Sequence, residues 1–165
     1  MAITVEDGSI VTGADSYISL ADARAILTPI GQDLNTTDAT AEQELRAALN
    51  YIESYRSRFT GNKKTKEQPL QWPRYSAVVD GFLIASDSIP NELKRAQVFA
   101  AYEIAQAESL QANDSGRKIS SEKLGSMAVS YFETGATESS KVFTRVMDEL
   151  APILVSATSI PLVRA

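Results

Sequence analysis

Residues 89–112 carry the longest run of helical hydrophobic spacing in the chain, with apolar side chains at steps of three and four. Pro90 suits the first helical position, where its missing N–H is not needed, and Glu92 suits the positive end of the helix dipole. Further apolar residues, many of them alanine, fall beside this stripe. We therefore predict a helix that forms the centre of a helical core; a wall shared with a neighbouring subunit is the alternative for its second face.

Three other stretches have the same periodicity. Ser19 and Thr40 are good N-cap residues and predict helices over residues 20–27 and 40–58. A last helix is expected to begin at Ser139 or Ser140 and to reach about residue 154. Pro152 should kink that helix or begin a new turn.

The hydrophobic period changes to two between residues 118 and 133, and this alternation predicts a β-hairpin that turns near residues 123–125. A lone two-stranded hairpin is marginally stable in water, so we expect it to pack against the helices or against another copy of the chain. Residues 75–82 are expected to form a short helix or turn, and residues 2–11 and 157–165 to be extended arms.

These elements predict a mainly α fold: a helical bundle of about four helices with a small β-hairpin and extended N- and C-terminal arms. A chain of 165 residues can build its own core. We expect a single domain over residues 1–165, with a core at about 13–155 and residues 156–165 as an extended docking arm.

Composition excludes several kinds of chemistry. Apolar residues make up 44% and charged residues 22% of the chain, both ordinary values for a globular protein. The absence of cysteine rules out disulfides and thiolate sites, and the absence of histidine removes the commonest general base and transition-metal ligand. No apolar run is long enough to span a membrane, and the acidic N-terminal residues lack the layout of a signal peptide. We expect synthesis in the cytoplasm and no membrane partner.

Two short motifs imitate known sites. Asp33, Asn35, Thr37 and Glu44 have the spacing of a calcium loop, but Asp38 stands where the tight turn needs glycine, so a polar loop before a capped helix is the better interpretation.

Ser120 and Lys123 have the spacing of a serine acyl-enzyme motif without its companion motifs. The neighbouring carboxylates at residues 42 and 44, or 148 and 149, point apart on a helix. We therefore expect no enzymatic activity, no catalytic residues, no cofactor and no metal.

Residues 45–75 hold seven cationic side chains against two carboxylates, a charge of +5, which leaves −10 for the rest of a chain of net charge −5. Aromatic residues lie among these cations, including Tyr55, Phe59, Trp72 and Tyr75. Such a mixture can hold single-stranded nucleic acid by phosphate contact and base stacking. We favour the alternative, in which the aromatic residues are core and the cations meet an acidic surface of a partner, because the whole chain is acidic.

Four pieces of sequence in a fixed order resemble one family. They are residues 13–20 (GADSYISL), 70–74 (LQWPR), 89–90 (IP) with 94–96 (KRA), and 121–126 (SEKLGS) with 129–131 (VSY). They resemble the head–tail connector, or adaptor, proteins of tailed bacteriophages, a family often labelled DnaT-like single-stranded-DNA-binding protein.

The resemblance implies a subunit that forms a ring, typically of twelve copies, below the phage portal protein. Such a ring extends the channel through which the genome DNA passes without sequence-specific binding, and it provides a platform for the next neck or tail protein. The protein would then belong to the neck of the virion. In the matching middle motif, Trp72, Pro73 and Arg74 are expected to form a structural corner.

Other residues are candidates for contacts in such a ring. The portal-docking candidates are Ile160, Pro161, Leu162, Val163, Arg164 and Ala165. The candidates for the subunit interface are Lys94, Arg95, Ala101, Ala105, Met127, Val129 and Tyr131. The alternative function is a DnaT-like single-stranded-DNA-binding replication accessory protein, and a hydrolase is a weaker third.

Overall fold

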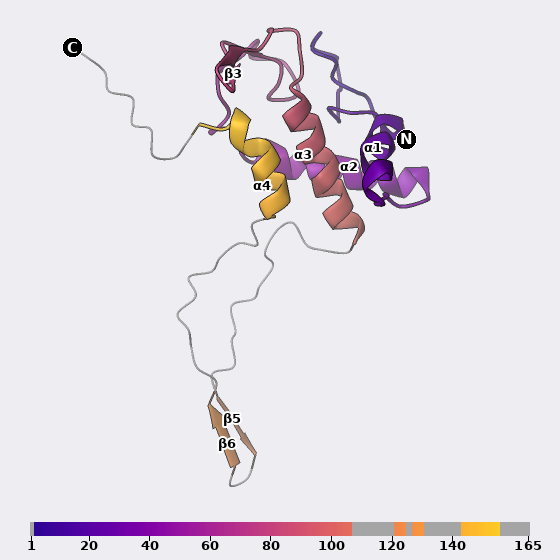
Figure 1. Ribbon diagram of the computed structural model, residues 1–165, viewed down its shortest axis with the longest axis vertical. Coiled ribbons are helices and arrows are strands. Elements are labelled where there is room, and N and C mark those ends of the chain that lie inside the picture. Colours follow the sequence, from indigo (N-terminus) through magenta and orange to yellow (C-terminus); the bar gives the residue numbers. More distant parts are fainter. Residues whose placement is uncertain (1, 107–120, 125–126, 131–142, 156–165) are drawn as a thin grey trace, which may run out of the picture.

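The computed structural model describes residues 2–106, 121–124, 127–130 and 143–155. Within them lie four α-helices: α1 (Leu20–Leu27), α2 (Asp38–Glu53), α3 (Asn91–Ala105) and α4 (Thr144–Leu150). Two 3-10 turns, η1 (Thr28–Ile30) and η2 (Ala151–Ile153), follow α1 and α4. The predicted helix-rich fold is confirmed, but α3 runs across α2 (Figure 1), so the helices do not form a simple bundle.

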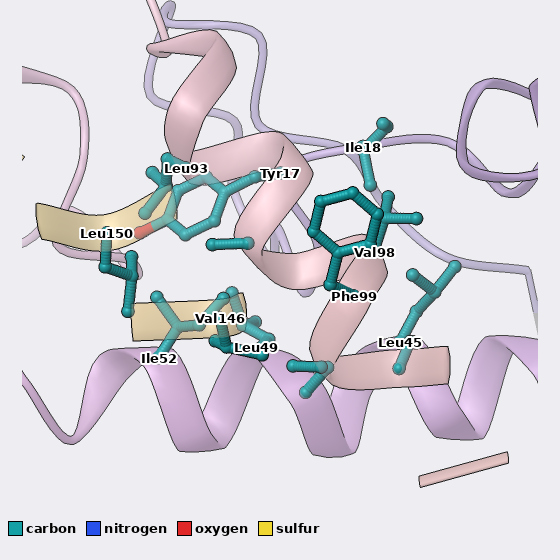
Figure 2. Close-up of a cluster of buried hydrophobic side chains, with 14 of the residues drawn as sticks. Tyr17, Ile18, Leu45, Leu49, Ile52, Leu93, Val98, Phe99, Val146 and Leu150 are labelled. Carbon is teal, nitrogen blue, oxygen red and sulfur yellow. The ribbon is translucent and has the colours of Figure 1, made fainter. Parts of the chain in front are cut away.

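Helix α3 is the centre of the core. It packs against α2 on one side and α4 on another, and it also contacts α1. Figure 2 shows the side chains that meet there: Leu45, Leu49 and Ile52 from α2, Leu93, Val98 and Phe99 from α3, and Val146 and Leu150 from α4. The alanines of α3 let its neighbours approach closely, and three of them have no exposed surface: Ala96, Ala100 and Ala101. The core interpretation of this helix is confirmed.

Helix α1 has the predicted bounds and the predicted cap, because the Ser19 hydroxyl accepts a hydrogen bond of 3.1 Å from the Asp22 N–H. The predicted cap Thr40 is wrong: helix α2 begins at Asp38 with Thr37 at its N-cap, and it ends at Glu53 instead of residue 58. The residues after α2 pair with the C-terminal part of the fold instead of continuing the helix. There the Val155 N–H donates to the Arg58 carbonyl at 2.6 Å.

Two short antiparallel strand pairs lie between α2 and α3. The first joins β1 (Asn62–Lys63) to β2 (Arg74–Tyr75), and the second joins β3 (Val78–Val79) to β4 (Phe82–Leu83). Of the two predictions for residues 75–82, the short helix is wrong and the turn is present, at Asp80 and Gly81 between β3 and β4. Asp80 and Gly81 have φ values of 51° and 84°. Their left-handed conformations favour a tight hairpin turn that matches the strand twist, and Asp-Gly is a preferred pair for such a turn.

The predicted hairpin near residues 123–125 is present: β5 (Ser121–Leu124) pairs with β6 (Met127–Ser130), with Leu124 opposite Met127. Among the residues that the structure describes, this hairpin contacts no other element. The predicted extension of α3 to residue 112, the predicted start of the last helix at Ser139 or Ser140, and the tail 156–165 lie outside the described residues. Pro152 does begin a new turn, η2. No described helix is long and apolar enough to cross a membrane.

Candidate functional site

The Trp72–Arg74 motif forms a buried corner beside the strand pairs. Trp72 has no exposed surface and packs edge-on against Phe59, with 6.2 Å between ring centroids. The Arg74 guanidinium donates hydrogen bonds to the carbonyls of Thr60 at 2.8 Å and Gly61 at 2.7 Å. These hydrogen bonds tie Arg74 to the backbone of residues 60 and 61. The Trp72 indole nitrogen is buried and has no hydrogen-bond partner among the described residues.

A buried tyrosine–carboxylate pair joins this corner to the N-terminal part of the chain. The Tyr17 hydroxyl donates to the Glu53 carboxylate at 2.5 Å and accepts from the backbone N–H of Trp72 at 3.2 Å. The Gln71 N–H also donates to Glu53, at 3.1 Å. Burial raises the pKa of Glu53 above its usual range, although hydrogen bonds from Tyr17 and Gln71 oppose the shift. The pair links three distant segments of the chain.

Gln97 connects helix α3 to two other segments and has no exposed surface. Its side-chain oxygen accepts from the Tyr17 N–H at 2.9 Å, and its amide nitrogen donates to the Ser16 hydroxyl at 3.0 Å and to the Leu45 carbonyl at 2.9 Å. Sequence reasoning missed this residue. The available signal was a polar side chain among the apolar residues of α3.

The basic and aromatic side chains of residues 45–75 do not form one surface. Trp72 and Phe59 are buried, and Tyr55 is half-buried with its hydroxyl 3.0 Å from that of Tyr51. Tyr75 is exposed at 48%. The favoured interpretation, that the aromatic residues are core, therefore fits three of the four.

The cationic side chains of this stretch also differ in their surroundings. Arg46 pairs with Asp15 at 2.6 Å, and Arg74 is buried in the corner. Arg56, Lys64 and Lys66 form no ion pair with any residue that the structure describes. Arg56 and Lys66 are exposed and Lys64 is half-buried, while most of the aromatic residues of this stretch lie in the core.

An apolar tip projects from the β3–β4 hairpin. Phe82 is 76% exposed and Leu83 is 72% exposed, and Val78 and Tyr75 close by in the chain are also exposed. We call Phe82 and Leu83, with the Asp80–Gly81 turn, the knob. Sequence reasoning missed it, because it assigned residues 75–82 to a different structure.

A groove of about 440 Å³ lies between the N-terminal arm, α1 and the start of α3. Its apolar lining includes Val5, Ile18 and Ile26. Its charged lining includes Asp7, Asp22 and Lys94. The carboxylate of Glu6 supports the arm from inside, because it accepts hydrogen bonds of 2.9 Å from three backbone N–H groups, those of residues 8, 10 and 11.

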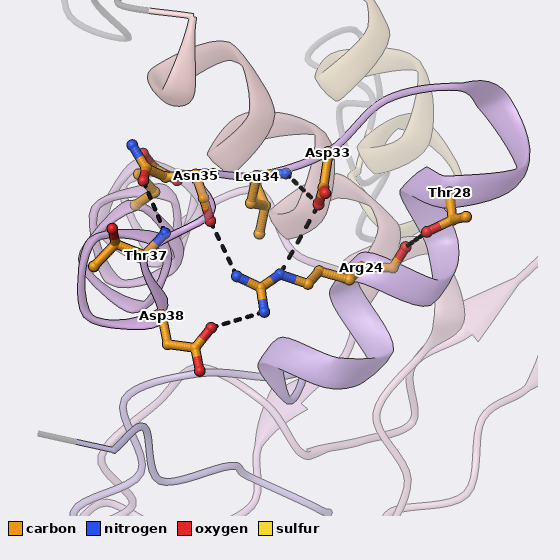
Figure 3. Close-up of polar contacts among 8 residues, drawn as sticks. Arg24, Thr28, Asp33, Leu34, Asn35, Thr37 and Asp38 are labelled. Carbon is orange, nitrogen blue, oxygen red and sulfur yellow. Dashed lines mark hydrogen bonds and ion pairs between the residues drawn. The ribbon is translucent and has the colours of Figure 1, made fainter.

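The calcium-like loop is closed by a cation from α1. Figure 3 shows the Arg24 guanidinium directed into the loop, where it pairs with Asp38 at 2.8 Å and donates to the Asn35 carbonyl at 3.0 Å. Asp33 lies 3.9 Å from the same guanidinium. Glu44 accepts from the Asn35 N–H at 3.3 Å. Across the described residues, no group of three or more Asp, Glu, His or Cys side chains is placed to hold a metal ion.

The interface candidates on α3 have different surroundings. Lys94 lines the groove, whereas Arg95 pairs with Glu149 of α4 at 2.8 Å and so contacts its own chain. Ala101 is fully buried within the subunit and has no surface left for a neighbour, while Ala105 is half-buried.

The remaining candidates lie in the hairpin and the tail. Met127 and Val129 belong to β6. Tyr131, Ser120 and the tail candidates at residues 160–165 lie outside the described residues.

Comparison with known proteins identifies the family. All of residues 1–165 match the family model described as "Putative DnaT-like ssDNA binding protein", so the match includes the corner, the knob and the groove. No curated protein and no solved structure matches the chain. The description agrees with the label implied by the sequence resemblance and does not mention a phage neck. The chain belongs to the family of putative DnaT-like single-stranded-DNA-binding proteins.

Proposed function

We propose that this protein is a ring-forming structural subunit of a bacteriophage neck, a head–tail adaptor. In this role it binds below the portal protein, extends the DNA channel and provides the platform for the next neck or tail protein. The observation that carries the proposal is the β5–β6 hairpin, which pairs only with itself among the described residues.

A two-stranded hairpin without a hydrophobic partner is marginal in water, so this hairpin needs a surface to complete it. Among the described residues no further strand pairs with its outer edges, and such edges can pair with another chain. A second copy of the same chain supplies such a surface at the high local concentration of a ring. The ordered motifs shared with head–tail adaptors support the same assembly.

A non-enzymatic role agrees with the chemistry of the chain. It has no histidine and no cysteine. The ionisable groups Glu6, Tyr17 and Glu53 are held in hydrogen bonds: those of Glu6 fix the N-terminal arm, and those of Tyr17 and Glu53 join separate segments of the fold. We propose no catalytic residue and no cofactor, and we place the protein in the virion after synthesis in the host cytoplasm.

Purified phage particles provide the test. We expect peptides of the chain in their mass spectrum, and density for a ring of its copies between portal and tail in electron micrographs. Replacing residues 121–130 by a Gly-Ser segment of equal length should leave the thermal midpoint of the purified chain unchanged and prevent ring formation on the portal. A protein absent from purified particles would remove the neck assignment.

Single-stranded-DNA binding is the second candidate, and the family description favours it. The described surface offers two exposed aromatic side chains, Tyr75 and Phe82, near the cations Lys64 and Lys66 in the chain. Base stacking on such side chains contributes about 1–3 kcal/mol per base.

Fluorescence anisotropy with a labelled oligonucleotide over a salt series tests this candidate. Binding should weaken steeply with salt, and Lys64→Ala with Lys66→Ala should reduce the salt dependence. Asn62→Ala is a neutral control on the neighbouring strand β1. Absence of binding at low salt would remove the candidate.

A further inference from the structure

We infer that the groove between the N-terminal arm, α1 and the start of α3 binds an extended, basic segment of another protein. In this contact an apolar side chain of the segment enters the groove, and cationic side chains beside it meet the carboxylates of the lining. The backbone of the segment pairs with the arm. The inference concerns a surface of the single subunit, so it does not depend on the neck assignment.

The charged side chains that line the groove are mainly acidic. Glu6, Asp7 and Asp22 are set against the ammonium group of Lys94. Three backbone N–H groups already bind the buried Glu6 carboxylate, whereas Asp7 and Asp22 are exposed and within reach of a partner. Carboxylates in this position favour a cationic partner. The net charge of the whole chain, −5, attracts a basic partner as well.

The groove also has room and apolar lining for a side chain. Its volume of about 440 Å³ is within the range of specific binding pockets. Val5, Ile18 and Ile26 line it from the arm, the segment before α1, and α1 itself. Val5 and Ile26 are only half-buried in the subunit, so an apolar side chain seated on them removes further apolar surface from water.

The arm has an open strand edge at Val5. A parallel bridge joins Val5 to Ser16. In it the Glu6 N–H donates to the Ser16 carbonyl at 2.8 Å, and the Ser16 N–H donates to the Thr4 carbonyl at 3.2 Å. The backbone N–H and C=O of Val5 therefore point away from the Ser16 segment, and they bond to no other backbone group that the structure describes. Such an edge accepts an extended segment by strand addition.

The arm is fixed in place without a partner. The Glu6 carboxylate accepts hydrogen bonds of 2.9 Å from the N–H groups of residues 8, 10 and 11, in the turn that follows Val5. Gly8 packs on the backbone of Asp87, where an added Cβ would lie 1.9 Å from the Asp87 carbonyl oxygen. Because the edge and the groove are already ordered, little conformational entropy is lost when a segment binds.

These features together favour a basic peptide segment over other ligands. Phosphate groups of DNA would face Asp7 and Asp22, so the groove does not suit the single-stranded-DNA candidate. In an extended segment, every second side chain lies on the same face. An apolar residue with a cationic residue two positions away on either side therefore places all three side chains in the groove and leaves the backbone for Val5.

Fluorescence anisotropy with two labelled peptides tests the inference. The basic probe is Ser-Arg-Ser-Leu-Ser-Arg-Ser, which carries both Arg side chains and the Leu side chain on one face when extended. The acidic probe has Glu in place of Arg. At low salt we expect the full chain to bind the basic probe about tenfold or more tighter than the acidic probe, and the difference should shrink as salt is added.

Charge variants locate the binding site. Asp7→Asn with Asp22→Asn should weaken binding of the basic probe about tenfold, and Lys94→Gln should strengthen it. Asp7→Asn alone changes only an exposed side chain of the arm and should also weaken binding. The matched control is Asp148→Asn, because Asp148 is an exposed aspartate that does not line the groove. Thermal midpoints show that each variant is folded.

Backbone methylation tests the strand addition. One version of the basic probe is N-methylated at its Ser residues, and a second version is N-methylated at Arg and Leu. Because alternate N–H groups of a strand point to opposite sides, only one of the two sets faces the arm. We expect one version to lose binding and the other to keep most of it.

Equal affinity for the two probes, no binding of the basic probe at low salt, or an equal loss in Asp148→Asn would overturn the inference. Self-association of the chain that Asp7→Asn with Asp22→Asn abolishes would identify a second copy as the occupant and overturn a foreign partner. All of these measurements use the purified chain. If the protein is absent from phage particles but binds the basic probe as described, the neck assignment fails and this inference stands.

Discussion

At the scale of single residues, this protein uses its buried polar side chains to connect segments far apart in the sequence. Gln97 joins α3 to the Ser16–Tyr17 segment and to α2, and Arg74 holds the carbonyls of the turn that leads into β1. Each replaces contacts with water by hydrogen bonds of good geometry, so removing one leaves buried backbone groups without a partner. The corner and the Gln97 contacts are therefore where single substitutions should have the largest effects.

Trp72→Ala should destabilise the subunit by about 3–5 kcal/mol, because a fully buried indole is lost and a cavity remains beside Phe59. Chemical denaturation followed by circular dichroism measures the change. Tyr75→Ala, which removes an exposed ring three residues away, should have little effect on the free energy of unfolding. Similar losses in the two variants would contradict the burial of Trp72.

The stability of the fold should depend on pH through Glu53. Burial raises its pKa above the unfolded value, so in the interval between the two values the folded state holds a proton that the unfolded state releases. This contribution to the free energy of unfolding is present at low pH and is lost as pH rises through the raised pKa. Glu53→Gln removes the titration while keeping an acceptor for the Tyr17 hydroxyl.

Urea unfolding of wild type and Glu53→Gln over a pH series checks this expectation. The stability of wild type relative to the variant should fall as the pH is raised from the ordinary glutamate range toward neutrality. A difference that is constant with pH, or that rises, would mean that Glu53 is not buried as described.

At the scale of elements, the helices differ in whether a local cap or packing against other segments stabilises them. Helix α1 begins at a side-chain cap, Ser19, whereas the N-cap residue of α2, Thr37, makes no side-chain cap hydrogen bond. Helix α2 is held by its packing against α3. The start of α1 was therefore correctly predicted from local sequence, whereas the N-cap of α2 is Thr37 and not the predicted Thr40.

Ser19→Ala should destabilise the protein by about 1 kcal/mol, because an N–H in the first turn of α1 loses its acceptor. Thr37→Ala is the matched control at the start of α2 and should change the free energy of unfolding by less than about 0.5 kcal/mol. Thermal unfolding of both variants measures the difference. A larger effect at Thr37 than at Ser19 would reverse this assignment of the caps.

At the scale of the whole molecule, surfaces with different chemistry lie apart on the part of the chain that the structure describes. The knob is apolar, the groove combines apolar and acidic side chains, and cations lie beside β1. The β5–β6 hairpin makes no contact with the other described elements. Exposed surfaces of this kind favour contacts with other molecules. We therefore propose assembly with further copies and with other neck proteins.

Removing residues 160–165 should weaken attachment to the portal protein without changing the folding of the subunit. If this tail docks on the portal, the truncated chain keeps the thermal midpoint of wild type, because the described core ends before it, and binds the portal more weakly. Pull-down with purified portal protein measures binding, and replacing the same residues by a Gly-Ser segment of equal length separates loss of sequence from loss of length. Unchanged attachment would contradict the docking role.

The sequence by itself determined that the fold is rich in helix, where α1 begins, that residues 121–130 form a hairpin, and that histidine and cysteine chemistry is absent. These follow from hydrophobic period, caps and composition, which are properties of neighbouring residues. The DnaT-like family label came instead from the resemblance of ordered motifs. Only the tertiary structure decided that Trp72 and Arg74 are buried, that Gln97 joins three segments, and that Phe82 and Leu83 are exposed. The reason is physical: whether a side chain meets water depends on which distant segments lie against it, and a pattern along the chain does not contain that information.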